Sequence, residues 1–316
     1  MRLIEAAGLS RRFTTKHGVV DAVRSVDFTV DAGEIVGFLG PNGAGKTTTM
    51  RMLTTLLKPT SGSAVVAGCD LATDPVGVRR RIGYVSQGGG ANPGYIVHEE
   101  IELQARLYGL GRAEVARRVD EVIAILDLAE LRDRVVGTLS GGQRRRLDIA
   151  LGLVHGPELV FLDEPSAGLD PTSRSHLWSY IRRLRDEHGT TVFLSTHYLD
   201  EADALCDRVL IMDAGRIIAE DSPETLKQRV SDDVVIVEIS GDVEVAGRAL
   251  REEAAVRDLT VDGAVLRFGT DRGDKAVTTT VRALDRADIE VLSIRVERPT
   301  LDDVFLALTE ETPIAA

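Results

Sequence analysis

Short apolar runs alternate with helix-like patterns over the first two thirds of the chain, which predicts a parallel α/β fold. From 158 to about 225 this alternation completes a parallel sheet with right-handed crossovers. Between about 88 and 157 the pattern is helical, because apolar residues recur at three- and four-residue spacing at Val115, Val119, Val122, Ile123 and Leu126. Buried strands are predicted at 34–39, 63–68, 82–86, 159–162 and 191–196.

The pattern changes after Lys227. Strands are predicted at 234–239, 256–261, 265–268 and 291–296, and helices at 245–253 and 275–287. This strand-helix-strand-strand-helix-strand order indicates a small split β-α-β sandwich. A closing helix begins at Thr300, a typical N-cap, and its apolar face consists of Leu301, Val304, Phe305 and Leu308. We therefore expect two domains, 1–227 and 228–316.

Composition restricts the classes of function. The 316 residues are 43% hydrophobic, but no apolar run reaches the ~18 residues that a membrane span needs. The N-terminus carries no apolar signal region, so we expect a cytoplasmic protein with at most a peripheral membrane role. A formal net charge of -12 argues against a nucleic-acid partner. Cys69 and Cys206 are expected to be reduced, buried thiols.

A glycine-rich loop follows the strand predicted at 34–39 and matches the phosphate-binding pattern G-x-x-x-x-G-K-[ST]. Glycines let backbone N–H groups turn inward around a polyphosphate, and the helix predicted at 48–57 adds its N-terminal dipole. Lys46 can reach the β- and γ-phosphates, and the Thr47 hydroxyl suits the shell of Mg²⁺. The alternative is a glycine-rich turn with a chance Lys-Thr. The predicted nucleotide-binding residues are Gly40, Pro41, Asn42, Gly43, Ala44, Gly45, Lys46, Thr47 and Thr48.

A second helix start has similar anion-binding character. Ser140 is a predicted N-cap, and Gly141, Gly142 and Gln143 precede the helical stretch 144–154. Two phosphate-type helix starts in one chain are redundant unless the second serves a nucleotide held elsewhere. With these motifs the chain resembles the ATP-binding cassette (ABC) ATPases. The resemblance implies that 140–143 is the signature motif, which contacts ATP bound by the partner subunit, and hence a homodimer with composite ATP sites.

The same resemblance implies an α/β P-loop NTPase core with a parallel sheet, an antiparallel β subdomain and a helical signature subdomain at about 88–157, followed by the small α+β domain. It also implies roles for Asp163 and Glu164, which end an apolar strand. Asp163 would hold Mg²⁺ through water, and Glu164 would orient the attacking water. A buried acidic pair beside phosphate is costly without a function, whereas a turn or helix-start pair is the ordinary alternative.

Four further positions match the family pattern. Gln87 matches the residue that touches Mg²⁺ and water and links the site to a membrane partner, and His197 matches the switch histidine that contacts the γ-phosphate. Asp170 ends the loop 166–170 that couples the two sites of the dimer. Phe13 lies where an aromatic ring stacks on adenine. Taken singly, Gln87 reads as a surface glutamine, His197 as a core histidine and Phe13 as a core aromatic. The order and spacing of the four positions support the family roles.

The C-terminal string from Leu301 to Thr309 resembles that of the daunorubicin-resistance group of ABC ATPases, so the resemblance covers nearly the whole chain. Members of that group energise a separate integral membrane permease of the ABC-2 type that exports drugs or other hydrophobic compounds. This implies a peripheral protein at the cytoplasmic face of the cell membrane. The stretch 88–100, where the permease would be received, departs from the family pattern, and its glycine content predicts a mobile loop.

Two alternatives belong to other classes. A soluble ABC ATPase acting on DNA or ribosomes is disfavoured by the single phosphate loop, the absence of sustained heptads and the acidic balance. A regulatory module without turnover would require Glu164 to be silent. The run Arg144, Arg145 and Arg146 is read as solvated charge. The other histidines show no metal-ligand spacing with the cysteines, so no metal site beyond Mg²⁺ is predicted.

Overall fold

The computed structural model of the chain describes residues 1–16, 18–230, 232–252, 256–271 and 273–310. The chain divides into two compact units, Met1–Pro223 and Glu224–Ala316, which are described separately below. The helix expected at 245–253 ends on residue 253, which lies outside the described residues.

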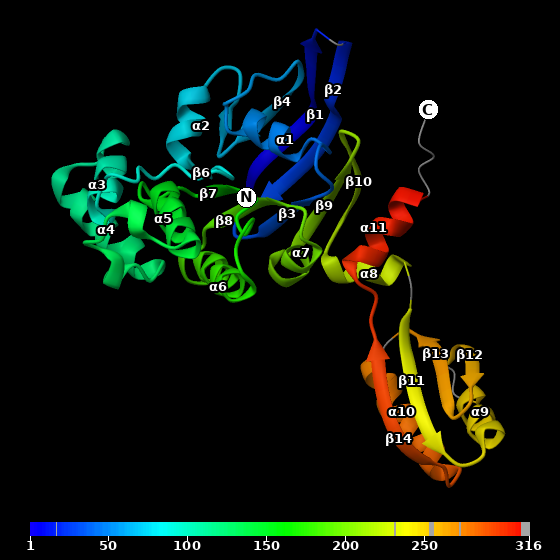
Figure 1. Cartoon of the computed structure of the whole chain (residues 1–316). Helices are drawn as coiled ribbons and strands as arrows, with labels where there is room; N and C mark the ends of the chain where they lie inside the picture. Colours follow the sequence, from blue (N-terminus) through cyan, green and yellow to red (C-terminus); the bar gives the residue numbers. More distant parts are fainter. Residues whose placement is uncertain (17, 231, 253–255, 272, 311–316) are drawn as a thin grey trace. The chain divides into compact units, whose positions relative to one another are not determined.

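The first unit is built on a six-stranded sheet (Figure 1). Five neighbouring strands are parallel, and the edge strand β10 (Arg216–Asp221) is antiparallel to its neighbour. The strands β3 (Ile35–Leu39), β7 (Leu159–Asp163) and β8 (Thr191–Thr196) are buried along their whole length, as parallel strands covered on both faces require. Beyond β10, the order continues with β9 (Arg208–Asp213), β3 (Ile35–Leu39), β8 (Thr191–Thr196), β7 (Leu159–Asp163) and β6 (Ile82–Val85).

An aromatic cluster joins this sheet to a second, antiparallel sheet. Phe28 of the antiparallel sheet stacks on Phe193 of β8 with ring centroids 5.8 Å apart and lies 6.0 Å from the ring of Phe38 of β3. All three rings are buried, so the main core of the unit lies between the two sheets. The antiparallel sheet has the order β2 (Gly18–Asp31), β1 (Arg2–Thr15), β4 (Ser61–Val66) and β5 (Cys69–Asp70).

Helices cover the parallel sheet, and three of the four named below directly follow one of its strands. The helix after β3 begins at Lys46 and ends four residues earlier than expected, because Thr55 takes a left-handed φ of 63°. Cys206, directly after α7 (Leu199–Leu205), is a buried free thiol, as is Cys69. The helices of this group are α1 (Lys46–Leu53), α2 (Pro75–Arg81), α6 (Pro171–His188) and α7 (Leu199–Leu205).

The predicted helical subdomain is confirmed and lies beyond the β6 edge of the sheet (Figure 1). It consists of α3 (Val97–Leu107), α4 (Arg112–Ile125) and α5 (Gly141–Leu153), with short 3-10 turns at Ala129–Leu131 and Val136–Thr138. Helix α3 packs on α4 and α5. The apolar residues that predicted this helical pattern, from Val115 to Leu126, are all buried.

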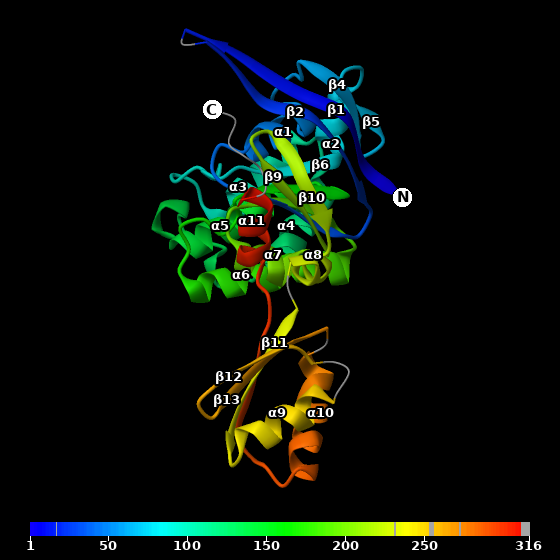
Figure 2. The same ribbon diagram turned by 90° about the vertical axis from the view of Figure 1, so that its right-hand side faces the viewer.

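The second unit has the predicted split β-α-β order. After α8 (Pro223–Val230), its antiparallel sheet has the order β12 (Arg257–Asp262), β13 (Val265–Thr270), β11 (Asp233–Ser240) and β14 (Glu290–Glu297). The helices α9 (Val243–Arg251) and α10 (Gly273–Arg286) cover one face of the sheet (Figure 2). Their buried side chains pack on Val235, Val237 and Phe268, which form a core separate from that of the first unit.

The closing helix α11 (Leu301–Glu310) begins as predicted. The Thr300 hydroxyl accepts a hydrogen bond from the backbone N–H of Asp303, and the Asp303 carboxylate accepts one from the N–H of Thr300. These reciprocal bonds are an N-terminal capping arrangement. Leu301 and Val304 are buried, whereas Leu306 is exposed. No helix within the described residues is long and apolar enough to cross a membrane.

A histidine joins the helical subdomain to the sheet. The ring of His155 stacks on Tyr108 at the end of α3, with ring centroids 3.7 Å apart, and its Nε2 lies 2.9 Å from the carbonyl oxygen of Ile82. A neutral ring can donate Nε2–H to that carbonyl. Burial lowers the pKa of His155 to about 4, against an ordinary value of 6.5. The folded state therefore holds this ring uncharged at neutral pH.

This burial makes stability depend on pH. Between pH 6.5 and pH 4 the unfolded chain binds a proton at His155 that the folded chain does not, so stability falls as pH falls through this window. We expect His155→Phe, which keeps the stacking, to remove up to ~3 kcal/mol of that loss. Urea unfolding from pH 4 to 8, followed by fluorescence of the chain's one tryptophan, Trp178, measures it. Exposed His188→Phe should keep the parent pH dependence; an equal effect of both would contradict the assignment.

Candidate active site

The parallel strands bring distant segments to one edge of the sheet. Carboxyl ends of neighbouring parallel strands lie together, and the pairing registers Leu39 with Thr196 and Asp163 with Ser195. The glycine-rich loop follows β3, Glu164 follows β7, and His197 follows β8. Gln87 comes two residues after β6, which pairs with β7.

The glycine-rich loop has the backbone shape that the sequence predicts. Gly43 and Gly45 have φ of 85° and 111°, which residues with a Cβ rarely adopt. A Cβ on Gly45 would press against the carbonyl oxygen of Ala22, whereas Gly43 faces open space. Helix α1 begins directly after Gly45 without a side-chain cap, so its first backbone N–H groups remain available to an anion. The loop is therefore a preformed cradle.

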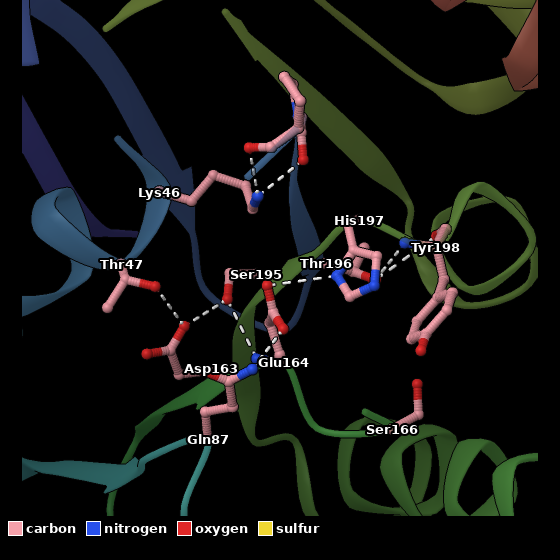
Figure 3. A network of polar contacts seen from close by, with 12 residues as sticks. Lys46, Thr47, Gln87, Asp163, Glu164, Ser166, Ser195, Thr196, His197 and Tyr198 are labelled. Carbon is pink, nitrogen blue, oxygen red and sulfur yellow. Dashed lines mark hydrogen bonds and ion pairs between the residues drawn. The ribbon is translucent and has the colours of Figure 1, made fainter. Parts of the chain in front are cut away.

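Lys46 is turned into this cradle. Its side chain is buried, and its Nζ donates to the carbonyl oxygens of Gly40 and Pro41 at 2.6 and 3.0 Å (Figure 3). Burial lowers the pKa of Lys46, while the carboxylates of Glu164 and Asp163 act in the opposite direction. A strongly hydrated ammonium with only two carbonyl partners is well placed to take up phosphate oxygens.

Asp163 is the most buried acid of this group. Its Oδ1 accepts from the Thr47 hydroxyl at 3.0 Å and from the Ser195 hydroxyl at 2.7 Å (Figure 3). Ser195 also accepts a hydrogen bond from the backbone N–H of Glu164. A carboxylate and a threonine hydroxyl within 3.0 Å of each other form a hard oxygen donor set. These residues fit a Mg²⁺ ion.

Glu164 lies beside Asp163 and faces two other predicted residues (Figure 3). The Gln87 amide donates to its Oε2 at 2.7 Å. His197 Nδ1 lies 3.2 Å from its Oε1, an ion-pair distance without hydrogen-bond geometry. Glu164 has a left-handed φ of 45°, a strained conformation for a residue with a side chain, and such strain concentrates at functional sites. Together, these residues form the carboxylate cluster: Lys46, Thr47, Gln87, Asp163, Glu164 and His197.

Five further predicted residues lie in a separate signature cluster, which the structure extends by Ser173. The signature cluster consists of Ser140, Gly141, Gly142, Gln143, Asp170 and Ser173. Ser140 caps α5, with a reciprocal bond between its backbone N–H and the Gln143 side chain. Asp170 caps α6 by accepting from the N–H of Ser173, and a Cβ on Gly142 would lie 3.0 Å from the Ser173 hydroxyl. Within the described part of the first unit, no hydrogen bond or ion pair joins the two clusters.

Phe13 lies on another element. It is half-buried on β1, pairs with Val20 of β2 and carries the Arg11 guanidinium 4.6 Å from its ring centroid. The ring therefore stands on the β1–β2 hairpin of the antiparallel sheet, and its role in adenine stacking stays a prediction.

The reading of the arginine run as solvated charge is wrong. Arg145 is buried and donates to three backbone carbonyl oxygens, those of Ser86, Asp163 and Pro165. Arg146 donates to the carbonyls of Leu126 and Asp127, and Arg144 to that of Ala91. A guanidinium has five N–H donors in a fixed fork, so it suits converging carbonyls, and a run of three arginines gives no local sign of such partners.

The glycine-rich stretch after Gln87 is tied down despite its composition. The Asp148 carboxylate on α5 accepts from the backbone N–H groups of Gly90 and Ala91 at 2.9 and 3.1 Å. Glu100 accepts from the N–H of Asn92. The expectation of a loose loop missed these acceptors, because they come from helices outside the loop.

Sequence reasoning also missed Ser195 as a part of this site. Ser195 is fully buried in β8, yet its hydroxyl donates to the Asp163 carboxylate at the end of β7 and accepts from the backbone N–H of Glu164. A buried hydroxyl directly after the apolar run 192–194, two residues before His197, is the signal that could have identified it.

Comparison with known proteins now decides the family. The chain matches the family model described as ABC transporter over 23–167, and that described as ATP-binding protein DrrA1-3-like, C-terminal domain, over 222–309. It is 41% identical over 312 residues to the daunorubicin/doxorubicin resistance ATP-binding protein DrrA of Streptomyces peucetius, covering 98% of this chain and 92% of that protein. The chain belongs to the DrrA family of ABC transporter ATP-binding proteins. It is an ABC ATPase, whose ATP hydrolysis drives transport.

Two further comparisons place this DrrA-family chain. The linearmycin resistance ATP-binding protein LnrL of Bacillus subtilis is 35% identical and is matched over 94% of this chain and 96% of LnrL. A solved dimeric ATP-binding cassette, in a post-hydrolysis state with ADP and phosphate, has a TM-score of 0.63 at 24% identity. That match covers 69% of this chain and 98% of the cassette and agrees with the fold of the first unit.

Ser195 gives the first prediction for this site. Ser195→Ala removes a donor from the buried Asp163 carboxylate, so we expect the free energy of unfolding to fall by ~1.5–3 kcal/mol. We also expect ATP turnover to fall about tenfold, equivalent to ~1.4 kcal/mol in the barrier. Urea unfolding and steady-state ATPase assays measure the two effects. Exposed Ser179→Ala on α6 is the matched control, and parent turnover in Ser195→Ala would remove Ser195 from the site.

Proposed function

We propose that this ABC ATPase hydrolyses ATP as a homodimer and energises a separate ABC-2 type membrane permease that exports a drug or another hydrophobic compound. The observation that carries the proposal is the division of the predicted residues between the carboxylate cluster and the signature cluster. One cluster has the acids, the lysine and the phosphate cradle, whereas the other has a capped helix start suited to an anion. A second copy of the chain would complete each site.

The carboxylate cluster would hold MgATP. Thr47 and Asp163 would bind Mg²⁺, Asp163 through water, and Gln87 would contact the same shell. Bound Mg²⁺ neutralises charge on the β- and γ-phosphates. Backbone N–H groups of the loop 40–48 would bind phosphate oxygens, and Phe13 would stack on adenine. The Thr47–Asp163 contact and the uncapped start of α1 support this arrangement.

Hydrolysis itself needs a positioned water and a stabilised phosphoryl group. Lys46 would exchange its two carbonyl partners for phosphate oxygens and stabilise charge there. Glu164 would orient and polarise the attacking water through a carboxylate oxygen, with Gln87 holding the other one. His197, beside Glu164, would contact the γ-phosphate. Ser140, Gly141, Gly142 and Gln143 would contact the γ-phosphate bound by the partner, and Asp170 would couple the two sites.

A membrane partner would dock on the helical subdomain. Leu103, Leu107 and Tyr108 of α3 and its end are exposed apolar residues, and Leu107 is 73% exposed. They lie on the helix that follows the loop after Gln87, so a partner seated there would reach the ATP site through that loop. Because no described helix can span a membrane, export would require a separate membrane protein. The chain would then lie at the cytoplasmic face of the membrane.

The class of cargo follows from the relatives alone. The Streptomyces peucetius relative is named for resistance to daunorubicin and doxorubicin, and the Bacillus subtilis relative for resistance to linearmycin. These names support export of a drug or a similar hydrophobic compound. They differ in the compound, so we propose a class and no single substrate.

Glu164→Gln tests the assignment of the water-orienting residue. The amide cannot take up a proton from water, so we expect ATP binding within about threefold of the parent and turnover reduced at least ~100-fold, the low end for a general base. ATP should then trap a dimer, visible by size-exclusion chromatography. Exposed Glu187→Gln on α6 is the control. Parent-level turnover in Glu164→Gln would remove Glu164 from this role.

Cross-linking tests the proposed permease. Cys69 and Cys206 are both buried, so an introduced surface cysteine can be labelled selectively. We expect Leu107→Cys with a photo-activated cross-linker, in membranes of the source cell, to capture a polytopic membrane protein that mass spectrometry identifies. Val76→Cys, exposed on α2, should not capture it. Capture of soluble partners only, with the protein absent from washed membranes, would favour the class that acts on DNA or ribosomes.

A further inference from the structure

One buried arginine connects the signature helix to both catalytic segments. Arg145 lies in the second turn of α5, the helix that begins at the signature residues, and it is only 7% exposed. Its Nη1 donates to the carbonyl oxygen of Ser86 at 2.7 Å, its Nη2 to that of Asp163 at 3.0 Å, and its Nε to that of Pro165 at 2.8 Å. All three guanidinium nitrogens are thus used.

The three carbonyls mark the positions next to the proposed catalytic residues. Asp163 and Pro165 flank Glu164, whose φ of 45° must be held by its surroundings. Ser86 precedes Gln87, and the Gln87 amide in turn donates to the Glu164 carboxylate. One side chain therefore fixes the backbone on both sides of Glu164 and immediately before Gln87.

Stability alone is a weak reason for such a group. A charged guanidinium removed from water loses hydration, and carbonyl partners return only part of that energy. The nearest charges are carboxylates that act at a distance: Asp148, Asp163 and Glu201 oppose the lowering of the Arg145 pKa that burial causes. Helix α5 needs no ion at this position for its own backbone bonds, because it begins with a complete capping box. The fork geometry matches the three carbonyls and explains the choice of arginine.

Two neighbours on α5 hold the segment that follows Gln87. Arg144 donates to the carbonyl of Ala91, and Asp148 accepts from the N–H groups of Gly90 and Ala91. Side chains of the same helix therefore form hydrogen bonds with Ser86, directly before Gln87, and with the loop that follows Gln87. A shift of α5 would move the Gln87 segment and the Glu164 segment together.

We propose that Arg145 is a positioning residue for ATP hydrolysis, which sets Glu164 and Gln87 relative to the helix that carries the signature. The inference rests on the roles given to Glu164 and Gln87 in the proposed function. Arg145 touches neither the nucleotide cradle nor an acid side chain, so its removal should impair the positioning of water and leave the binding of ATP nearly intact.

The test compares arginines with similar partners. Arg118 on α4 is largely buried and donates to the carbonyls of Leu153 and Val154 at the far end of α5, away from both clusters. Arg145→Lys keeps the charge, but one nitrogen cannot reach three carbonyls. We expect Arg145→Lys in the full chain to lower kcat about thirtyfold or more, with KM for MgATP changed less than about threefold. Arg118→Lys should keep kcat within about twofold. The free energy of unfolding, measured with urea and Trp178 fluorescence, should fall by a similar amount in both variants.

Each outcome decides the proposal. A parent-level kcat in Arg145→Lys, or a raised KM with kcat unchanged, would overturn it. An equal loss of kcat in Arg118→Lys would do the same, because it would assign the effect to α5 packing in general. Unfolding of Arg145→Lys at the assay temperature would likewise overturn it, because Arg145 would then have only a structural role. Glu164→Gln is assayed alongside: parent turnover there defeats the proposed function itself, whatever Arg145 does.

Discussion

The buried carboxylate of Asp163 is the constraint around which the site is organised. An acid in this position must be hydrogen-bonded or neutralised, and the fold supplies hydroxyls from two other segments, Thr47 of α1 and Ser195 of β8. These partners are available only because β3, β8 and β7 are adjacent parallel strands whose carboxyl ends meet. The sheet order is thus a requirement of the chemistry as well as of the core. Glu164 is the next residue in the chain, so the same arrangement of strands also fixes its position.

The helical subdomain is held to that edge by buried polar contacts rather than by apolar packing alone. Arg145 donates to carbonyls at the ends of β6 and β7, and Asp148 accepts from the loop that follows. Such contacts are directional, so they define the orientation of α5 more narrowly than apolar contacts of equal area would. His155, stacked on Tyr108 and bonded to Ile82, adds a third polar link between the subdomain and β6.

The fold could be predicted from the sequence wherever the signal is local. Apolar runs marked β7 and β8, the glycine pattern marked the phosphate loop, and a Ser-Gly-Gly-Gln string marked the start of α5. Thr300 and the apolar face of α11 followed from capping and spacing in the same way. Arg145 and Ser195 could not be assigned, because their partners are backbone or carboxylate groups that lie 18 to 59 residues away in the sequence. A residue whose role depends on tertiary contacts leaves only a weak signal in the local sequence, such as a hydroxyl directly after an apolar run.

The position of Arg145 gives the proposed dimer a physical reason to couple its two sites. In that dimer, the first turn of α5 would meet the nucleotide held by the partner, and the second turn holds the backbone around this chain's Glu164. A helix is stiff over two turns, so a displacement at Ser140 cannot be absorbed before it reaches Arg145. The geometry of one site would then depend on whether the other contains ATP. Coupling of this kind needs no moving loop, only a rigid element with polar contacts at both of its functional positions.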